Sequence, residues 1–303
     1  MKTVKVFYAG VPSKNTNPEK LDVLRFFHMG VPNGQSTEVK VPQHSACDLA
    51  VMQGWVHENS GRTPHLMFRR EIIRQQHLAK KHVLAIDSNL FLWKDPSNSH
   101  HYLRFSLNDV FPQTGNYFTD NVDPARWNKI RNDLKIDIQP WRKQGRHILI
   151  CLQRNGGWSM KQLPVMQWLP NIIDQIKKHT DRKIVVRAHP GDRRSKDYLK
   201  LNVPGVRIST NPTILQDFVD CHAVVTYNSS PGVAAAVEGI PIFVMDPEPK
   251  TSQAYDVANT DITTINDPKT FDRQPWLEKL AMSHFDYNDL RNGTAWNIIK
   301  DYI

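Results

Sequence analysis

The feature that most constrains the fold is an alternation in residues 147–245, where short β-branched runs are separated by longer amphipathic stretches. Between the first two runs, residues 164–179 place their apolar side chains on one helical face. Strands joined by helices form a parallel sheet covered on both faces. This half predicts an α/β domain, with a single mixed α+β domain as the alternative. The predicted strands are 147–152, 183–188, 206–209, 223–226 and 240–245.

The first half is less regular. Strands are predicted at 4–9, 50–53 and 82–86, a helix at 64–80, and long loops with short strands at 96–118. Residues 275–303 carry two helical patterns, interrupted at Asn292-Gly293. A length of 303 residues suggests about two domains. We place them at 1–140 and 141–290, with a C-terminal helix at 291–303, because the charged, turn-prone segment 136–146 separates the halves.

Composition excludes several classes of protein. No run of 18 apolar residues is present, so no transmembrane helix is expected, and a chain that is 40% hydrophobic is not mainly disordered. The three cysteines are far apart and form no CxxC pair, so neither a disulfide framework nor a zinc site is indicated. The N-terminus is typical of a β-strand and not of a signal peptide, which predicts a cytoplasmic location.

Positive charge is concentrated in one segment. The net charge is +9, with +11 in residues 141–210, +5 in 1–140 and −7 in 211–303. An excess of Lys and Arg attracts anionic ligands. We therefore expect an anion site in the segment 141–210.

Three turns after predicted strands have the chemistry of such a site. Gln153 and Arg154 precede Gly156-Gly157, and glycines let backbone N–H groups approach a phosphate, although an ordinary βα turn is the alternative. In the second turn Arg187 and His189-Pro190 end a strand, where a structural histidine is the alternative.

The third turn is the strongest local signal. Ser229 and Ser230 are followed by Pro231-Gly232 and a run of small residues that ends at Glu238-Gly239. Hydroxyls at a strand-to-helix turn, together with free N–H groups, make an anion site. Helix capping by Ser230 is the alternative, but it explains one serine and not the pair.

A carboxylate in the first half is a candidate base. Asp87 ends an apolar strand, and Arg104 and Ser106 lie on the next strand-like run. A carboxylate at a strand end can face a cleft and accept a proton. Capping of a turn by Asp87 is the alternative.

The order of these motifs resembles the GT-B glycosyltransferases, and most of all the capsule-type Kdo transferases and polysialyltransferases with their HP and SS motifs. The segment 86–91 resembles their acidic motif, and Arg104–Ser106 resembles a later Arg-Ser element. The resemblance implies two Rossmann-like domains whose parallel sheets face a central cleft, with the terminal helix crossing back to the first domain. It implies that His189, Ser229 and Ser230 bind the donor, and that Asp87 serves catalysis.

The predicted activity is transfer of a sugar from a UDP- or CMP-sugar to a hydroxyl. The nucleotide sugar is a co-substrate and no cofactor is expected. No DxD pair stands at a strand end, so no metal is expected either. The sequence predicts no oligomeric state. The donor-binding candidates are Gln153, Arg154, Gly156, Gly157, Arg187, His189, Pro190, Ser229, Ser230, Gly232 and Glu238.

For the acceptor, the sequence leans toward a hydroxymethylated pyrimidine in phage-type DNA. A basic helix in the first domain could contact phosphates, and aromatic and amide side chains could receive an extruded base. A capsular or surface glycan is the alternative acceptor. A non-catalytic nucleic-acid-binding protein and a nucleotide-sugar epimerase or glycerol-phosphate transferase are alternatives of other classes. The acceptor-binding candidates are Arg69, Arg70, Arg74, Arg104 and Ser106.

Overall fold

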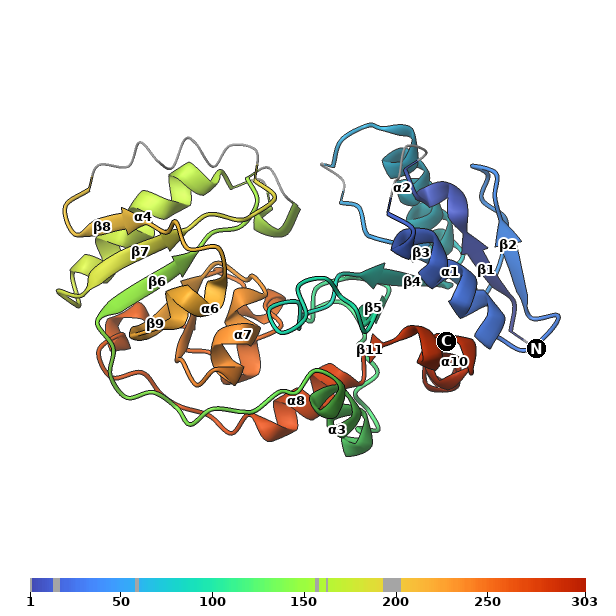
Figure 1. The fold of residues 1–303 in the computed structure, drawn as a ribbon. Helices are drawn as coiled ribbons and strands as arrows, with labels where there is room; N and C mark the ends of the chain where they lie inside the picture. The colour runs from blue at the N-terminus through green and yellow to red at the C-terminus, as the bar shows by residue number, and fades with distance from the viewer. Residues whose placement is uncertain (1, 13–16, 58–59, 156–157, 162, 193–202) are drawn as a thin grey trace. The chain divides into compact units, whose positions relative to one another are not determined.

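The structure is a computed structural model that describes residues 2–12, 17–57, 60–155, 158–161, 163–192 and 203–303 (Figure 1). The chain forms two compact units. Unit 1 comprises Met1–Leu134 and Glu278–Ile303, and unit 2 comprises Lys135–Leu277. The boundaries therefore differ from those predicted at 140 and 290, because the chain returns to unit 1 within helix α8 (Gln274–Ala281) and not after residue 290.

Unit 1 is built on a six-stranded sheet with the order β11-β5-β4-β3-β1-β2. Strands β1 to β4 are parallel, whereas β5 and β11 run antiparallel to their neighbours. Its elements are β1 (Val4–Phe7), η1 (Tyr8–Gly10), α1 (Glu19–Gly30), β2 (Ser36–Val39), β3 (Leu49–Gln53), α2 (Pro64–Leu78), β4 (His82–Asp87), β5 (Leu103–Leu107), α3 (Pro124–Asp133), β11 (His284–Phe285), α9 (Tyr287–Arg291), α10 (Thr294–Ile299) and η6 (Lys300–Tyr302).

The predicted strands and helix of the first half are present as β1, β3, β4 and α2. Helix α1 is not predicted from the sequence, although its buried residues Val23, Leu24, Phe26 and Phe27 have helical spacing. Strand β2 is not predicted either. Among the described strands it pairs only with β1, and none of its residues is fully buried, so it lacks the apolar run that marks a strand.

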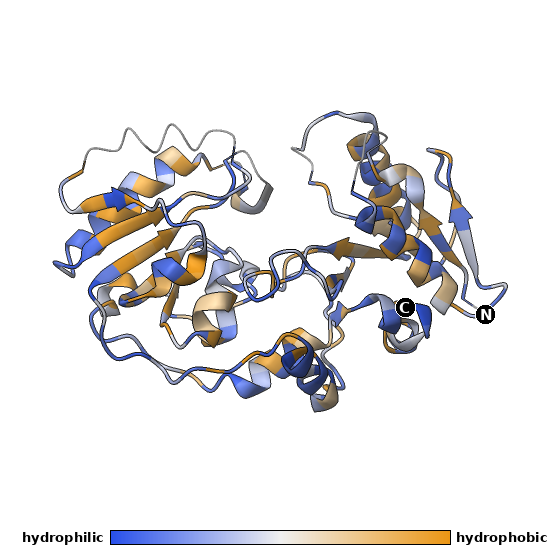
Figure 2. Cartoon of the chain, in the orientation of Figure 1, coloured by the Kyte–Doolittle hydropathy of each residue, from blue (hydrophilic) through white to orange (hydrophobic). Residues whose placement is uncertain are grey.

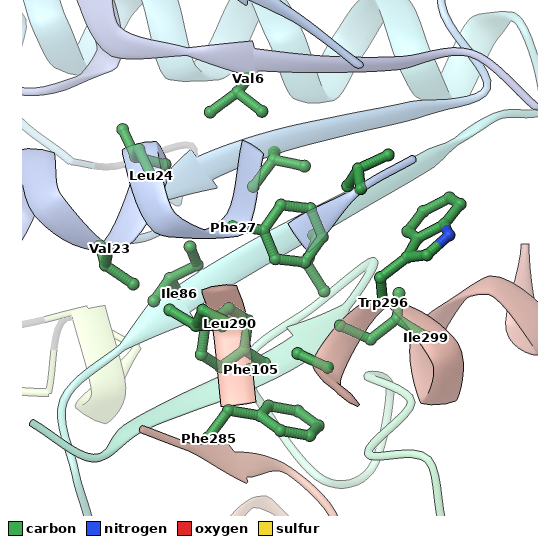
Figure 3. Close-up of a cluster of buried hydrophobic side chains, with 14 of the residues drawn as sticks. Val6, Val23, Leu24, Phe27, Ile86, Phe105, Phe285, Leu290, Trp296 and Ile299 are labelled. Carbon is green, nitrogen blue, oxygen red and sulfur yellow. The ribbon is translucent and has the colours of Figure 1, made fainter. Parts of the chain in front are cut away.

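The main core of unit 1 lies between the sheet and helices α1, α9 and α10 (Figure 3). The sheet, α1 and the C-terminal helices all contribute side chains to one continuous cluster. Helix α2 packs against a separate cluster that includes Phe7, Met52 and Ile72. The labelled side chains of the main core are Val6, Val23, Leu24, Phe27, Ile86, Phe105, Phe285, Leu290, Trp296 and Ile299.

A buried charge network also holds the C-terminal segment to unit 1. Arg126 of α3 forms an ion pair with Asp289 of α9 at 3.0 Å and donates to the carbonyl of His284. Lys129, one turn later, pairs with Asp286 at the N-cap of α9. Removing one partner of a buried pair leaves an uncompensated charge. The network therefore favours the packing in which α3 contacts α9.

Unit 2 contains a five-stranded, fully parallel sheet with the order β10-β9-β6-β7-β8, as the sequence predicts. Its elements are β6 (His147–Cys151), η2 (Trp158–Met160), α4 (Val165–Lys177), β7 (Lys183–Arg187), β8 (Val206–Ile208), α6 (Ile214–Phe218), β9 (Cys221–Thr226), α7 (Pro231–Val237), β10 (Ile242–Val244), η3 (Pro249–Thr251), η4 (Tyr255–Val257) and η5 (Ile262–Thr264).

The strands β6, β9 and β10 are largely apolar (Figure 2), and nearly all of their residues are buried. The apolar face of α4 covers one side of the sheet and contributes Trp168, Leu169 and Ile173 to the core. The small residues of α7 are almost all buried as well. In the described part of the chain, no helix is both long and apolar enough to cross a membrane.

Candidate functional site

The predicted donor turns lie at one edge of the unit 2 sheet. Gln153 follows β6, His189 follows β7 and Ser229 follows β9, and these strands are parallel neighbours with β6 in the middle. Strands lie about 4.8 Å apart, so the ends of β7 and β9 are about 10 Å from each other. The chain runs from β6 to β7 and β8 on one side of β6 and then crosses to β9 and β10 on the other side. The strand order therefore reverses beside β6, and such a topological switch point is where open α/β sheets bind ligands.

Hydrogen bonds join the three turns. The backbone N–H of Asn155 donates to Asp192 Oδ2 at 3.2 Å, which links the β6 turn to the His-Pro turn. On the other side, Gln153 Nε2 donates to Asn228 Oδ1 at 2.6 Å, which links the β6 turn to the serine turn. The three turns are therefore connected to one another.

His189 is held as a neutral hydrogen-bond donor. The Gly191 N–H donates to its Nδ1 at 3.0 Å, so the neutral ring carries its proton on Nε2. Desolvation by the turn lowers the pKa of His189, and the charge of Arg154 lowers it further. His189 and Pro190 are both exposed, so the Nε2–H of His189 can reach a ligand oxygen. Within the described residues no carboxylate pairs with Arg154, which leaves this exposed cation beside the imidazole.

The serine turn presents an exposed hydroxyl, that of Ser230. The Ser229 N–H donates to Thr226 Oγ1 at 2.8 Å, which shapes the turn. Ser230 is exposed at the N-cap of α7 and makes no side-chain cap hydrogen bond. In the structure the Ser230 side chain therefore does not cap α7. Gly232 is buried, and a Cβ there would lie 3.2 Å from the Ala254 Cβ, so its role here is close packing.

A buried hydrogen-bond network that the sequence does not predict lies behind the serine turn. Asn228 Nδ2 donates to Asp246 Oδ2 at 2.9 Å and to Thr251 Oγ1 at 3.0 Å. Asp246 follows β10, the edge strand beside β9. Gln153 also donates to Ser159 Oγ, whereas its buried Oε1 has no partner among the described residues. Asn228 stands directly before the serine pair, and that adjacency is the signal that could have identified it.

Two donor candidates are engaged elsewhere. Arg187 forms an ion pair with Asp217 at 2.6 Å and donates to the carbonyls of the loop before α6. This arrangement favours a structural role for Arg187. Glu238 lies at the C-terminal end of α7, next to Gly239, whose Cβ position would meet the carbonyl of Pro140 in the segment that leads into β6. It is therefore near the opposite edge of the sheet and is not brought together with His189. Gly156 and Gly157 lie outside the described residues.

In unit 1, the structure brings Asp87 and Arg104 together. They are register partners on β4 and β5, and Arg104 Nη2 lies 2.7 Å from Asp87 Oδ2. Burial alone would lower the pKa of Arg104, but Tyr117 and Asp87 outweigh it and raise the pKa. The Asp87 side chain stays 29% exposed, so a ligand hydroxyl can approach its carboxylate. Ser106 is buried within β5.

The arginines of α2 are committed to protein contacts. Arg69 is buried and donates to the Gly10 carbonyl at 2.8 Å. Burial lowers its pKa to about 10, partly opposed by the charge of Asp87. Gly54, at φ +80°, leaves room for this guanidinium, since a Cβ would lie 2.7 Å from Nη1. Arg70 donates to carbonyls including that of His57, and Arg74 pairs with Glu71.

Comparisons with known proteins identify the fold. No family model and no curated protein matches the chain. Among solved structures, it is similar to the β-Kdo 2,4 transferase of KpsC from Thermosulfurimonas dismutans, with a TM-score of 0.55, 11% identity, and 93% of this chain and 90% of that chain covered. The β-Kdo 2,7 transferase of the same KpsC gives a TM-score of 0.53, 10% identity and full coverage of both chains. The chain thus has the predicted GT-B fold, which it shares with these two structures.

Proposed function

We propose that the chain transfers a sugar from a nucleotide-sugar donor to a hydroxyl of a capsular or surface glycan. The fold is that of two Kdo transferases, so a Kdo-type or sialyl-type sugar carried by CMP is the proposed donor. In this proposal unit 2 binds the donor and unit 1 binds the acceptor.

One observation carries the proposal. The His-Pro turn and the serine turn lie on the same sheet edge, and two hydrogen bonds through the β6 turn connect them. Nε2–H of His189, the hydroxyl of Ser230 and the charge of Arg154 are the groups available to hold a phosphate. Turns at opposite edges of the sheet would have been incompatible with one phosphate site.

The proposed reaction forms one bond and breaks one. The acceptor oxygen bonds to the anomeric carbon of the donor, the bond from that carbon to the phosphate oxygen breaks, and the nucleotide leaves with the electron pair. Donors around the phosphate stabilise the charge that develops on it. Asp87 accepts the proton from the acceptor hydroxyl.

The glycan replaces DNA as the proposed acceptor. The comparisons lend no support to a DNA-modifying activity. Of the predicted phosphate contacts, Arg69 is buried and Arg74 is paired with Glu71, so these side chains serve the unit itself. A protein that binds DNA through its backbone needs free cations on its surface.

The donor is tested with radiolabelled CMP-Kdo, CMP-N-acetylneuraminate, UDP-glucose and UDP-N-acetylglucosamine. We expect one CMP-sugar to be hydrolysed slowly without acceptor and to release CMP. An epimerase would instead convert its UDP-sugar to an isomer without net loss of the nucleotide sugar. If all four donors stay intact with and without a glycan acceptor, the proposed function fails.

The acceptor is tested by offering hydroxymethylated DNA, unmodified DNA and Kdo-bearing oligosaccharides in a salt series. We expect transfer to the oligosaccharide and no binding of either DNA at about 150 mM salt. Transfer to hydroxymethylated DNA, with an affinity that falls steeply with salt, would contradict the glycan proposal.

His189→Ala should weaken donor binding about 10- to 100-fold, because a hydrogen bond to a charged phosphate is lost. Isothermal titration of CMP measures the change, and His189→Gln, which keeps an N–H donor, should recover part of the affinity. Lys40→Gln in unit 1 removes an exposed cation and serves as the control. Unchanged nucleotide affinity in His189→Ala would exclude this histidine from the phosphate site.

A further inference from the structure

One amide side chain lies at the centre of the sheet edge that carries the donor turns. Asn228 stands directly before the serine pair and is 8% exposed. Its Oδ1 accepts from Gln153 Nε2 at 2.6 Å, and its Nδ2 donates to the Ser159 carbonyl at 3.0 Å and to Asp246 Oδ2 at 2.9 Å. A single side chain thus connects the serine turn to the β6 turn, to η2 and to the segment that follows β10.

The carboxylate of Asp246 determines which way this amide points. Asp246 is 5% exposed, and an ionised carboxylate only accepts hydrogen bonds. Besides Asn228, the Thr251 hydroxyl donates to its Oδ2 at 2.5 Å and the Glu248 N–H donates to its Oδ1 at 2.9 Å. Nδ2 of Asn228 must therefore face Asp246, and Oδ1 of Asn228 must face Gln153.

The same orientation leaves one buried acceptor without a partner. Gln153 has to present Nε2 to Asn228, and the same Nε2 donates to Ser159 Oγ at 2.8 Å. Its Oε1 is buried and accepts no hydrogen bond within the described part of the chain. A buried acceptor that stays unpaired destabilises the folded state. The network therefore calls for a reason other than folding stability.

The network fixes the backbone under two groups that are available to hold a phosphate. Ser230 follows Asn228 by two residues, Arg154 follows Gln153 directly, and both side chains are exposed. Among the described residues, neither side chain has a hydrogen bond or an ion pair of its own. Their positions are therefore set by the turns that carry them. Groups that stabilise a developing charge must be in place before the reaction.

We propose that Asn228, oriented by Asp246, is a positioning residue for the donor phosphate. It holds the serine turn and the β6 turn in a fixed relation, so that the groups they carry converge on one phosphate. The inference rests on the proposed function and adds a residue that acts on the donor through the turns and not by contact. A displacement of about 1 Å in such a site can lower turnover about 100-fold.

Asp246→Asn tests this role because positioning and charge predict opposite results. The variant keeps the volume of the side chain, but its amide sets an N–H group against one of the surrounding donors, so the Asn228 amide can turn over together with that of Gln153. We expect kcat of sugar transfer to fall about 10- to 100-fold, with KM for the donor within about threefold. Removing a buried negative charge near an anion site would by itself favour phosphate binding and turnover. An unchanged or raised kcat therefore overturns the proposal.

A double variant checks that the loss comes from the orientation of Asn228. Asn228→Asp combined with Asp246→Asn exchanges the carboxylate and the amide, so the pair is complementary again and Gln153 again faces an acceptor. We expect its kcat to be at least about fivefold higher than that of Asp246→Asn, although its negative charge lies nearer the serine turn. Asn171→Asp, at an exposed position of α4, is the matched control and should have wild-type kcat. A double variant no more active than Asp246→Asn contradicts the proposed orientation.

Nucleotide binding separates this proposal from the proposed function. CMP and cytidine are titrated into wild type and Asp246→Asn, and binding is followed by NMR. We expect CMP, which carries the charge of the leaving phosphate, to bind the variant about 10-fold more weakly, and cytidine to bind both proteins equally. If no donor is consumed but this difference holds, only the transferase proposal fails. If wild type transfers sugar and Asp246→Asn matches it in kcat and in CMP affinity, only the positioning role fails.

Discussion

Asp87→Asn should lower kcat by a factor of about 10² to 10⁴, the usual contribution of a positioned general base. Asparagine keeps the size of the side chain and can still accept a hydrogen bond from Arg104, which lies 2.7 Å from the carboxylate. It cannot, however, take a proton from the acceptor hydroxyl. Stopped assays of sugar transfer at saturating donor and acceptor measure the effect.

Two further measurements test whether a loss of turnover comes from the chemical role of Asp87. Nucleotide affinity should stay unchanged in Asp87→Asn, because Asp87 belongs to unit 1 and the donor turns belong to unit 2. Asp120→Asn, at an exposed position of unit 1, should have normal turnover and is the matched control. Turnover of Asp87→Asn within a factor of about three of wild type would remove this residue from the mechanism.

The placement of the donor turns could be predicted from the sequence because strand polarity fixes it. Once 147–152, 183–188 and 223–226 are parallel strands of one sheet, whatever follows each strand lies at the same edge. The exact neighbours still matter, and these require β6 to lie between β7 and β9. Asn228 and Asp246 were missed because a buried amide and carboxylate form no recognisable motif until their strands are side by side.

The arginines show the limit of sequence reasoning. A run of basic residues has the same sequence whether its guanidiniums face solvent or the protein. Arg187 was predicted to hold phosphate, yet Asp217, from a different element, pairs with it at 2.6 Å. Arg69 was predicted to contact the acceptor, yet it is buried against the Gly10 carbonyl. Such contacts depend on tertiary packing, which spacing along the chain does not reveal.

Acid should destabilise the folded chain below about pH 6.5 because of one buried histidine. His284 has no exposed surface; its Nδ1–H donates to the Leu280 carbonyl at 2.8 Å, and Nε2 accepts from the Leu90 N–H at 3.3 Å. A second proton on the ring would set two donors against each other. Burial is the main cause that lowers the pKa of His284 to about 3, and the charges of Arg104 and Arg126 add to it.

The sign of the effect follows from proton uptake. Between the unfolded pKa of about 6.5 and the folded pKa of about 3, the unfolded chain binds a proton that the folded chain does not. The stabilisation is therefore complete above pH 6.5 and is lost as the pH falls toward 3. The free energy of unfolding should decrease by up to about 1.4 kcal/mol per pH unit from this group alone.

Urea unfolding at pH 7.5, 6.5, 5.5 and 4.5, followed by tryptophan fluorescence, measures this slope. Because other groups titrate in the same range, the quantity to compare is the slope of wild type minus that of His284→Gln, which cannot be protonated. Between pH 6.5 and 4.5 we expect wild type to lose about 2 kcal/mol more than the variant. His77→Gln, at an exposed position near the end of α2, should keep the wild-type slope. Equal slopes for wild type and His284→Gln would mean that His284 can be protonated in the folded protein. The packing of β11 against the β4–β5 connection would then have to be looser than the structure shows.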